Sequence, residues 1–282
     1  MKGDKDMPFV NPDPSVISDK DLYIFDMDGT IYLGFSVFPF AVRFINHLRA
    51  SGRKVLFFTN NASHTADFYV RKLTRLGFSP TRDEIMTSGD VTIEFLRRHR
   101  PGKSVYLVGT DELVEDFRAA GINVLTGEEE KADIVITSFD TTLTYHKLDM
   151  ACRLIRGGAE YLSTHPDFNC PTETGFIPDS GAIAAFVTAS TGRKPVYFGK
   201  PYRETVEMIG EATGIGLDRM CIFGDRLYTD IAVGKKHGIT AVLVYSGETT
   251  PGDVEAAAPE DQPDYAYPSL DDVDRIMFGD GV

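Results

Sequence analysis

The sequence is poor in cysteine and in basic residues, and both shortages limit what the protein can be. Its three cysteines are Cys152, Cys170 and Cys221, and their spacing fits neither a disulfide framework nor a zinc site, so we expect reduced thiols. Lys and Arg number 29 against 42 Asp and Glu, which gives a formal net charge of -13. This acidity argues against a general electrostatic attraction to nucleic acid or to an anionic membrane.

Long apolar runs are also missing. No stretch of the sequence approaches the roughly 18 apolar residues of a membrane-spanning helix, so we expect no membrane partner. The beginning of the chain is polar, rich in Asp and Pro, and lacks the apolar segment of a signal peptide. We therefore expect a cytoplasmic protein whose residues 1–15 form a flexible leader.

What the sequence does contain is a regular alternation of short apolar runs with helical patterns. The runs predict strands at Leu22–Phe25, Lys54–Phe58, Ser104–Val108, Ile122–Leu125, Ile134–Thr137, Val196–Phe198, Met220–Phe223 and Ala241–Val244. The helical patterns predict helices at Phe40–Ala50, Thr65–Leu76, Glu112–Ala120, Lys147–Gly157, Tyr202–Thr213 and Asp230–His237. Strands that alternate with helices are typical of an α/β fold, and strands that are apolar on both faces indicate a parallel sheet with both faces covered.

The first apolar run ends in a pair of carboxylates. Asp26 and Asp28 follow the strand Leu22–Phe25, and Gly29 permits a sharp turn after them. In such sheets the reactive residues lie just past the carboxyl ends of the strands. Two carboxylates that face one pocket repel each other unless a cation lies between them, which indicates a hard metal such as Mg²⁺. The simpler alternative is an Asp-Gly turn that only ends the strand.

Three later runs end in polar residues of other kinds. Thr59 and Asn60 follow the second strand and offer a hydroxyl, an amide and backbone N–H groups to phosphate oxygens. Lys200 brings a compact cation to the end of another run, and Asp225 and Asp230 follow a fourth. Taken singly, these segments also fit a helix N-cap, a surface lysine and an acidic loop. Their combination is far more specific than any one of them.

The order of these residues resembles the four loop motifs of the haloacid dehalogenase-like hydrolase superfamily. Asp26-Met27-Asp28-Gly29-Thr30 is similar to the first motif, Thr59 to the second, Lys200 to the third, and Asp225 with Asp230 to the fourth. The resemblance covers nearly the whole chain.

The sequence resembles one branch of that superfamily in particular, the NagD-like or p-nitrophenyl phosphatase group. The segments that carry this resemblance are Phe58-Thr59-Asn60-Asn61 and Gly224-Asp225-Arg226. The resemblance implies a Rossmann-like parallel-sheet core with a second, smaller α/β cap domain of the C2 type. Thr59 and Lys200 are 141 positions apart, which leaves room for a cap between the second and third motifs. We expect the core at residues 16–101 and 195–282 and the cap at residues 102–194.

The resemblance also implies an activity, the hydrolysis of small phosphate monoesters through an aspartyl-phosphate intermediate. Asp26 would be the nucleophile, because a carboxylate can attack phosphorus and divide a hard hydrolysis into two easier transfers. Asp28 would protonate the leaving oxygen and then activate the water that hydrolyses the intermediate. Nucleoside monophosphates, sugar phosphates and p-nitrophenyl phosphate are the substrate types that the branch suggests.

By the same resemblance, Mg²⁺ would be held by Asp26, Asp225 and the backbone carbonyl of Asp28. Lys200 and the metal would offset the charge of the phosphate. Thr59 and Asn60 would bind the phosphate oxygens by hydroxyl and backbone N–H. Asp230 would orient Lys200 or a metal-bound water.

The cap would read the leaving group of the substrate. Candidate readers are Asp140, His165 and Asp179. The branch commonly carries Asn where His165 stands, and this departure weakens the transfer of a relative's substrate to this chain. His165 could contact the substrate, but a packed or solvated loop histidine is the simpler interpretation. The sequence also leaves open a homodimer formed through the cap.

Two other functions compete with a phosphatase. A non-enzymatic phospho-ligand binder or regulator could have the same fold, but the presence of all four polar elements argues against it. Dehalogenases of the superfamily lack an acid at the position of Asp28, and mutases generally carry their cap after the first motif, so neither fits this sequence.

Overall fold

The computed structural model describes residues 15–34, 36–125, 127, 129–172 and 175–279. The chain divides into two compact units, the first comprising Met1–Phe58, Val70–Ile85 and Ile209–Val282 and the second Thr59–Tyr69 and Met86–Met208. The predicted leader lies outside the described residues except for Ser15, which begins helix α1 (Ser15–Ser18). The predicted cap, residues 102–194, falls wholly within the second unit.

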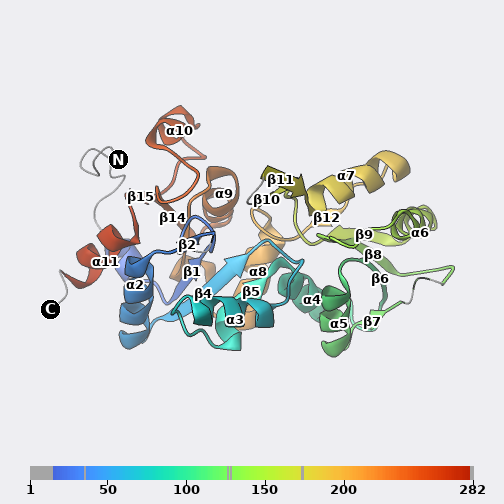
Figure 1. Cartoon of the computed structure of the whole chain (residues 1–282), viewed down its shortest axis with the longest axis horizontal. Coiled ribbons are helices and arrows are strands. Elements are labelled where there is room, and N and C mark those ends of the chain that lie inside the picture. Colours follow the sequence, from blue (N-terminus) through green and yellow to red (C-terminus); the bar gives the residue numbers. More distant parts are fainter. Residues whose placement is uncertain (1–14, 35, 126, 128, 173–174, 280–282) are drawn as a thin grey trace. The chain divides into compact units, whose positions relative to one another are not determined.

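The larger sheet has six strands in the order β15-β14-β13-β1-β4-β5 (Figure 1). Its strands are β1 (Leu22–Phe25), β4 (Lys54–Thr59), β5 (Ile85–Thr87), β13 (Met220–Gly224), β14 (Thr240–Val244) and β15 (Tyr265–Tyr267). β1 pairs in parallel with both β4 and β13, and every residue of β1, β13 and β15 is buried. This burial is expected of a parallel sheet covered on both faces.

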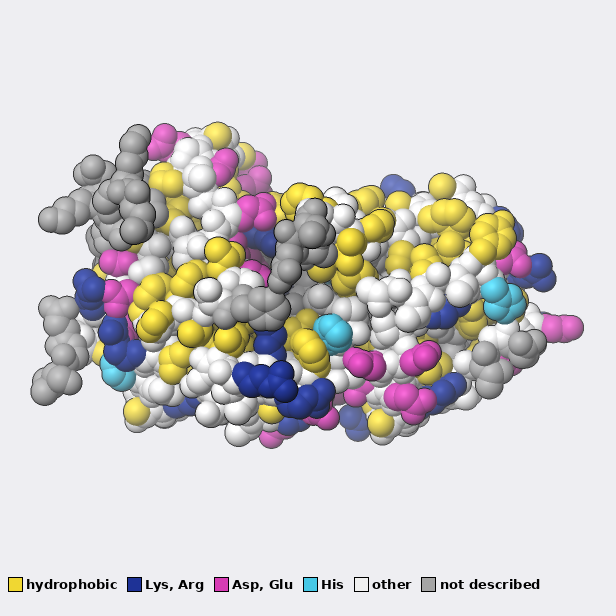
Figure 2. Space-filling model, in the orientation of Figure 1, with side chains coloured by type: hydrophobic (Ala, Val, Ile, Leu, Met, Phe, Trp, Pro, Cys, Tyr) yellow, Lys and Arg dark blue, Asp and Glu magenta, His cyan; other side chains and the backbone are white. Residues whose placement is uncertain are grey.

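The first unit also contains a small hairpin and several helices, of which α3 and α8 are divided between the two units: β2 (Tyr32–Leu33), β3 (Ser36–Val37), α2 (Pro39–Ala50), α3 (Ala66–Arg75), α8 (Arg203–Thr213), α9 (Ala232–His237), α10 (Pro251–Ala256) and α11 (Leu270–Phe278). α2 is an example of an amphipathic helix with one buried face. Its buried residues Ala41, Phe44, Ile45 and Leu48 recur at helical spacing and form one apolar stripe. α2 also packs against α11. Lys and Arg side chains gather over α3, a local basic patch on an acidic protein (Figure 2).

The second unit contains a five-stranded parallel sheet in the order β12-β9-β8-β6-β7. Its strands are β6 (Ser104–Val108), β7 (Asn123–Val124), β8 (Ile134–Thr137), β9 (Glu160–Ser163) and β12 (Val196–Tyr197), and its helices are α4 (Ser88–His99), α5 (Asp111–Ala119), α6 (Tyr145–Arg156) and α7 (Ser180–Thr191). A buried cluster joins the sheet to α6 and α7 through Val135, Ile155 and Val187. An antiparallel hairpin, β10 (Asn169–Thr172) and β11 (Gly175–Pro178), precedes α7.

The predicted α/β class is confirmed by this architecture, and the eight predicted strands all occur within two residues of their expected bounds. The predicted helix over Asp230–His237 is different in the structure. A π-helical turn, η3 (Leu227–Ile231), contains Asp230, and α9 begins only at Ala232. Such turns widen the backbone locally and are frequent at functional sites.

None of the helices in the described part of the chain combines the length and the apolar character needed to cross a membrane.

Candidate active site

Strand register brings the ends of β1 and β13 to the same edge of the larger sheet. The two strands run parallel with Phe25 opposite Phe223, whose rings stack with centroids 5.0 Å apart. Asp26 then donates its backbone N–H to the carbonyl oxygen of Phe223 at 2.9 Å. Asp26 and Asp225 therefore lie at adjacent positions just past the ends of their strands, next to the stacked rings of Phe25 and Phe223.

Three carboxylates converge at this edge, and we call Asp26, Asp225 and Asp230 the acidic trio. Each offers one oxygen, and these oxygens lie within 4.8 Å of one another. Asp225 is 2% exposed and Asp230 is 0% exposed, while Asp26 is half-buried. Two like unit charges 4 Å apart repel by about 4 kcal/mol at an effective dielectric near 20. A hard divalent cation, which prefers carboxylate oxygens, would turn this repulsion into attraction.

Two glycines form a cradle around the carboxylate of Asp225. A Cβ atom would lie 2.4 Å from Asp225 Oδ2 if built on Gly29 and 2.0 Å from it if built on Gly247. Glu248 donates its backbone N–H to the same oxygen at 2.7 Å, and Ser246 Oγ donates to the carbonyl oxygen of Gly29 at 2.7 Å. Any side chain on either glycine would displace the carboxylate, so the cradle fixes Asp225 in one position.

Asp28 lies on the turn between β1 and β2, and its side chain is exposed. The turn is closed by a hydrogen bond from Gly29 N to the carbonyl oxygen of Tyr32 at 2.7 Å. Lys72 Nζ lies 4.0 Å from the centroid of the Tyr32 ring. Burial lowers the pKa of Lys72, and the charge of Asp28 opposes that shift. Asp28 therefore lies in the field of a partly buried cation, although neither Tyr32 nor Lys72 was expected near it from the sequence.

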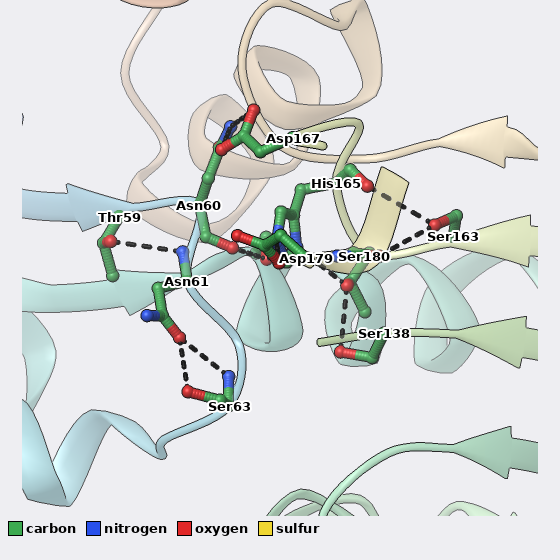
Figure 3. Close-up of polar contacts among 12 residues, drawn as sticks. Thr59, Asn60, Asn61, Ser63, Ser138, Ser163, His165, Asp167, Asp179 and Ser180 are labelled. Atoms are coloured by element: carbon green, nitrogen blue, oxygen red, sulfur yellow. Dashed lines mark hydrogen bonds and ion pairs between the residues drawn. The ribbon is translucent and has the colours of Figure 1, made fainter. Parts of the chain in front are cut away.

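In the second unit, the side chain of Asn60 holds the backbone of Lys200. Asn60 Oδ1 accepts from Lys200 N at 2.7 Å, and Asn60 Nδ2 donates to the Lys200 carbonyl oxygen at 3.0 Å. Lys200 is 3% exposed. Thr59 Oγ1 accepts from the backbone N–H of Asn61 at 3.2 Å (Figure 3). The sequence predicted Asn60 as a phosphate ligand through its backbone, and it missed this pairing of two of the predicted site residues.

His165 is completely buried, and both of its ring nitrogens have partners (Figure 3). Nε2 lies 2.8 Å from Asp179 Oδ1, and Nδ1 lies 3.0 Å from Thr164 Oγ1 and 3.2 Å from Ser88 Oγ. The hydroxyl of Ser88 donates to the carbonyl oxygen of Asn60 and that of Thr164 donates to Ser138 Oγ, so both hydroxyls are left to accept from Nδ1. This arrangement favours a His165 that donates at both nitrogens, that is, an imidazolium.

Electrostatics agrees with this protonation state. Burial by itself would lower the pKa of His165, but the hydrogen bond to Asp179 and the charges of Asp179 and Asp167 raise it overall. Asp179 is 4% exposed and also accepts from the backbone N–H of Ser180 at 2.6 Å, at the N-terminus of α7. The pair joins β9 and α7 through a buried ion pair.

Asp140, His165 and Asp179, which the sequence predicted to contact the substrate, bind other residues of the second unit. Asp140 is 5% exposed, lies 2.7 Å from Lys147 Nζ and accepts from the backbone N–H of Thr142 at 2.8 Å. His165 and Asp179 bind each other. None of the three presents a side chain to solvent in this structure.

The sequence did not predict a role for the segment that follows β14. Ser246, Gly247 and Glu248 contact the first and fourth motifs through the cradle described above, and Arg226 lies beside the acidic trio. The signal that could have found the segment was its place directly after the apolar run Ala241–Val244, the position at which the other site residues were sought.

Comparisons with known proteins identify the family of the chain. A family model described as haloacid dehalogenase-like hydrolase matches residues 23–123, and a second, described as HAD-hydrolase-like, matches residues 197–273. An acid sugar phosphatase of Staphylococcus aureus is 34% identical over 235 residues, which covers 83% of this chain and 89% of that protein.

Solved structures are similar along almost the whole chain. A 4-nitrophenylphosphatase from Thermotoga maritima is 42% identical with a TM-score of 0.87, covering 93% of this chain and 99% of that one. A glycerol phosphate phosphatase from Mycobacterium tuberculosis, solved in complex with magnesium, is 29% identical with a TM-score of 0.83, covering 92% and 77%. The chain therefore belongs to the haloacid dehalogenase-like hydrolase family, among its NagD-like and p-nitrophenyl phosphatase members.

Proposed function

We propose that the protein is a Mg²⁺-dependent phosphatase that hydrolyses small phosphate monoesters. The observation that carries this proposal is the acidic trio, held by a glycine cradle at the carboxyl edge of the sheet. Membership of a family whose similar members are named phosphatases supports the reaction type.

The trio and its surroundings fit a magnesium ion. Asp26 and Asp225 would hold it together with the backbone carbonyl of Asp28, and the cradle keeps the carboxylate of Asp225 from turning away. When bound, the ion supplies positive charge that offsets the repulsion between these carboxylates and an anionic substrate. Asp230, which accepts from the backbone N–H of Arg226 at 3.2 Å, would brace the turn that carries Asp225.

The chain's own residues would carry the chemistry. A carboxylate oxygen of Asp26 attacks phosphorus, the bond from phosphorus to the ester oxygen breaks, and Asp28 gives its proton to the leaving alcohol. Asp28, now ionised, takes a proton from water as that water attacks phosphorus and releases Asp26 and phosphate. An exposed Asp28 suits a group that must exchange protons with both an alcohol and water.

Thr59, Asn60 and Lys200 are proposed to bind the phosphate. The double hydrogen bond between the Asn60 amide and the Lys200 backbone supports this proposal, because it couples the second motif to the third. Lys200 would supply the ammonium group that an acidic protein needs for an anionic substrate. Sugar phosphates and glycerol phosphate are the substrates to test first, since similar proteins are named for them.

Two further expectations are proposals of the same kind. The cysteines are free thiols, which supports a reducing, cytoplasmic location. Exposed apolar side chains on β11 and α7, namely Phe176, Ile177 and Phe186, support a homodimer through the cap, and hydrophobic side chains are visible on the surface formed by α7 (Figure 2).

The test is hydrolysis of p-nitrophenyl phosphate by the full-length protein. We expect turnover with Mg²⁺, none with EDTA, and a loss of at least about 10⁴-fold in Asp26→Asn, because the nucleophile is gone. If the wild-type protein with Mg²⁺ bound sugar phosphates but hydrolysed no member of a phosphate-ester panel, the competing function, a non-enzymatic phospho-ligand binder, would be favoured.

A further inference from the structure

Arg226 follows Asp225 directly and is held in place on both sides. Its backbone N–H donates to Asp230 Oδ2 at 3.2 Å, and its Nε lies 2.9 Å from Glu248 Oε2. Tyr228 Oη donates to the same carboxylate, at 3.1 Å to one oxygen and 3.2 Å to the other. The arginine side chain is only 27% exposed. Glu248 therefore restrains Arg226 by an ion pair that Tyr228 supports.

The acidic trio is the other charged group that acts on Arg226. Arg226 directly follows Asp225 and binds Asp230 through its backbone N–H, and the negative charges of Asp26, Asp225 and Asp230 act on its guanidinium. A guanidinium stays protonated at any working pH, so Arg226 is a cation beside three carboxylates. Glu248 is connected to the same centre by its backbone, which donates to Asp225 Oδ2 at 2.7 Å.

We propose that Arg226 is a positioning residue whose fixed positive charge, restrained by Glu248, partly neutralises the acidic trio. This charge would weaken the binding of the metal and strengthen the binding of phosphate. This inference rests on the proposed metal site. A fixed positive charge beside the trio repels a divalent cation and attracts a phosphate anion. Removing that charge should strengthen metal binding and weaken phosphate binding.

Glu248 should act with the opposite sign. Glu248→Gln keeps the backbone N–H that binds Asp225 but removes the carboxylate that offsets Arg226. The positive charge of the Arg226 guanidinium is then no longer offset by the carboxylate of Glu248. Mg²⁺ should therefore bind more weakly and phosphate more tightly. A merely structural role for either side chain would weaken both ligands together.

The experiment is isothermal titration of the full-length protein with Mg²⁺ alone, and then with inorganic phosphate at saturating Mg²⁺. In Arg226→Gln we expect Mg²⁺ to bind about fivefold to tenfold more tightly and phosphate about fivefold to tenfold more weakly. Glu248→Gln should shift both affinities the other way by about threefold. Arg226→Lys, which keeps the charge, should change each by less than about threefold.

Thermal unfolding without metal checks that each variant is folded, and Arg226→Lys provides the comparison if Arg226→Gln is unstable. If Arg226→Gln lost affinity for both Mg²⁺ and phosphate, or changed neither affinity, the inference would be overturned. The proposed function would still stand if the wild-type protein bound Mg²⁺ and hydrolysed esters. A wild-type protein that binds no Mg²⁺ would overturn both.

Discussion

Two clusters in this protein have similar dimensions and opposite electrostatics. The acidic trio in the first unit and the cluster of His165, Asp167 and Asp179 in the second each place three ligand-type atoms within 4.8 Å of one another. In the trio all the charges have the same sign. In the histidine cluster an imidazolium is paired with Asp179, and Asp167 accepts from the amide of Asn60 at 3.2 and 3.3 Å.

The difference shows that the spacing of potential ligands does not by itself define a metal site. The donors of His165 are used for hydrogen bonds that hold β9, α4 and α7 together, so a cation there would have to displace a proton and break an ion pair. The trio would instead lose repulsion when a cation binds.

The largest effect is expected in the trio. Asp225→Asn keeps an oxygen that can accept from Glu248 N but removes one negative charge, so the affinity for Mg²⁺ should fall by about a hundredfold or more. Calorimetric titration measures it. Glu115→Gln removes an exposed carboxylate from α5 and should leave the affinity unchanged. Equal Mg²⁺ affinity in Asp225→Asn and wild type would show that Asp225 is no ligand.

A substitution in the histidine cluster should lower the stability of the protein and leave its affinity for Mg²⁺ unchanged. His165→Ala leaves the buried charge of Asp179 without its partner, so the free energy of unfolding should fall by about 3 kcal/mol. Chemical denaturation gives this value, and a titration at a temperature where the variant is folded should give a wild-type affinity for Mg²⁺. A stable variant with lost metal affinity would reverse the roles of the two clusters.

The cradle should show a smaller effect. Gly247→Ala places a Cβ atom against Asp225 Oδ2, so the carboxylate must shift, and Mg²⁺ affinity should fall by about tenfold. Gly252→Ala is the matched control, because its Cβ would meet only Thr250 Oγ1, at 3.8 Å. If the two alanine variants bound Mg²⁺ equally well, the cradle would have no role in holding the ligand.

The smallest effect is a pH dependence. The pKa of His165 is raised in the folded protein, so the stability it contributes is complete below its ordinary pKa of 6.5 and is lost as the pH rises through the higher folded value. Unfolding measured between pH 6 and pH 9 should therefore show a steeper loss of stability in wild type than in His165→Asn. Parallel curves would mean that His165 is neutral in the fold.

The sequence predicted the core of the fold and of the site because both depend on local signals. Apolar runs identified β1, β4 and β13, and the polar residues at their ends include Asp26 and Asp225, which the structure brings together. α7 was missed because it is apolar nearly all round, so it has no polar face to reveal a helical period. α4 was missed although Thr87 and Asp90 form a capping box at its start.

The contacts that give each side chain its role could not be predicted from the sequence. His165 and Asp179 are separated by 14 positions and bind each other only because β9 and α7 pack together. The same holds for Glu248, whose two partners, Arg226 and Tyr228, lie about 20 positions earlier in the chain. Such pairings depend on tertiary packing, and no spacing rule in the chain encodes them.

The central claim is that Asp26 and Asp225 of the acidic trio, and not the histidine cluster, hold the metal. Crystals grown with Mn²⁺ in place of Mg²⁺ would locate the ion by anomalous scattering. We expect one strong peak within about 2.0–2.4 Å of carboxylate oxygens of Asp26 and Asp225. A peak among His165, Asp167 and Asp179, or no peak at the trio in crystals of an active protein, would contradict it.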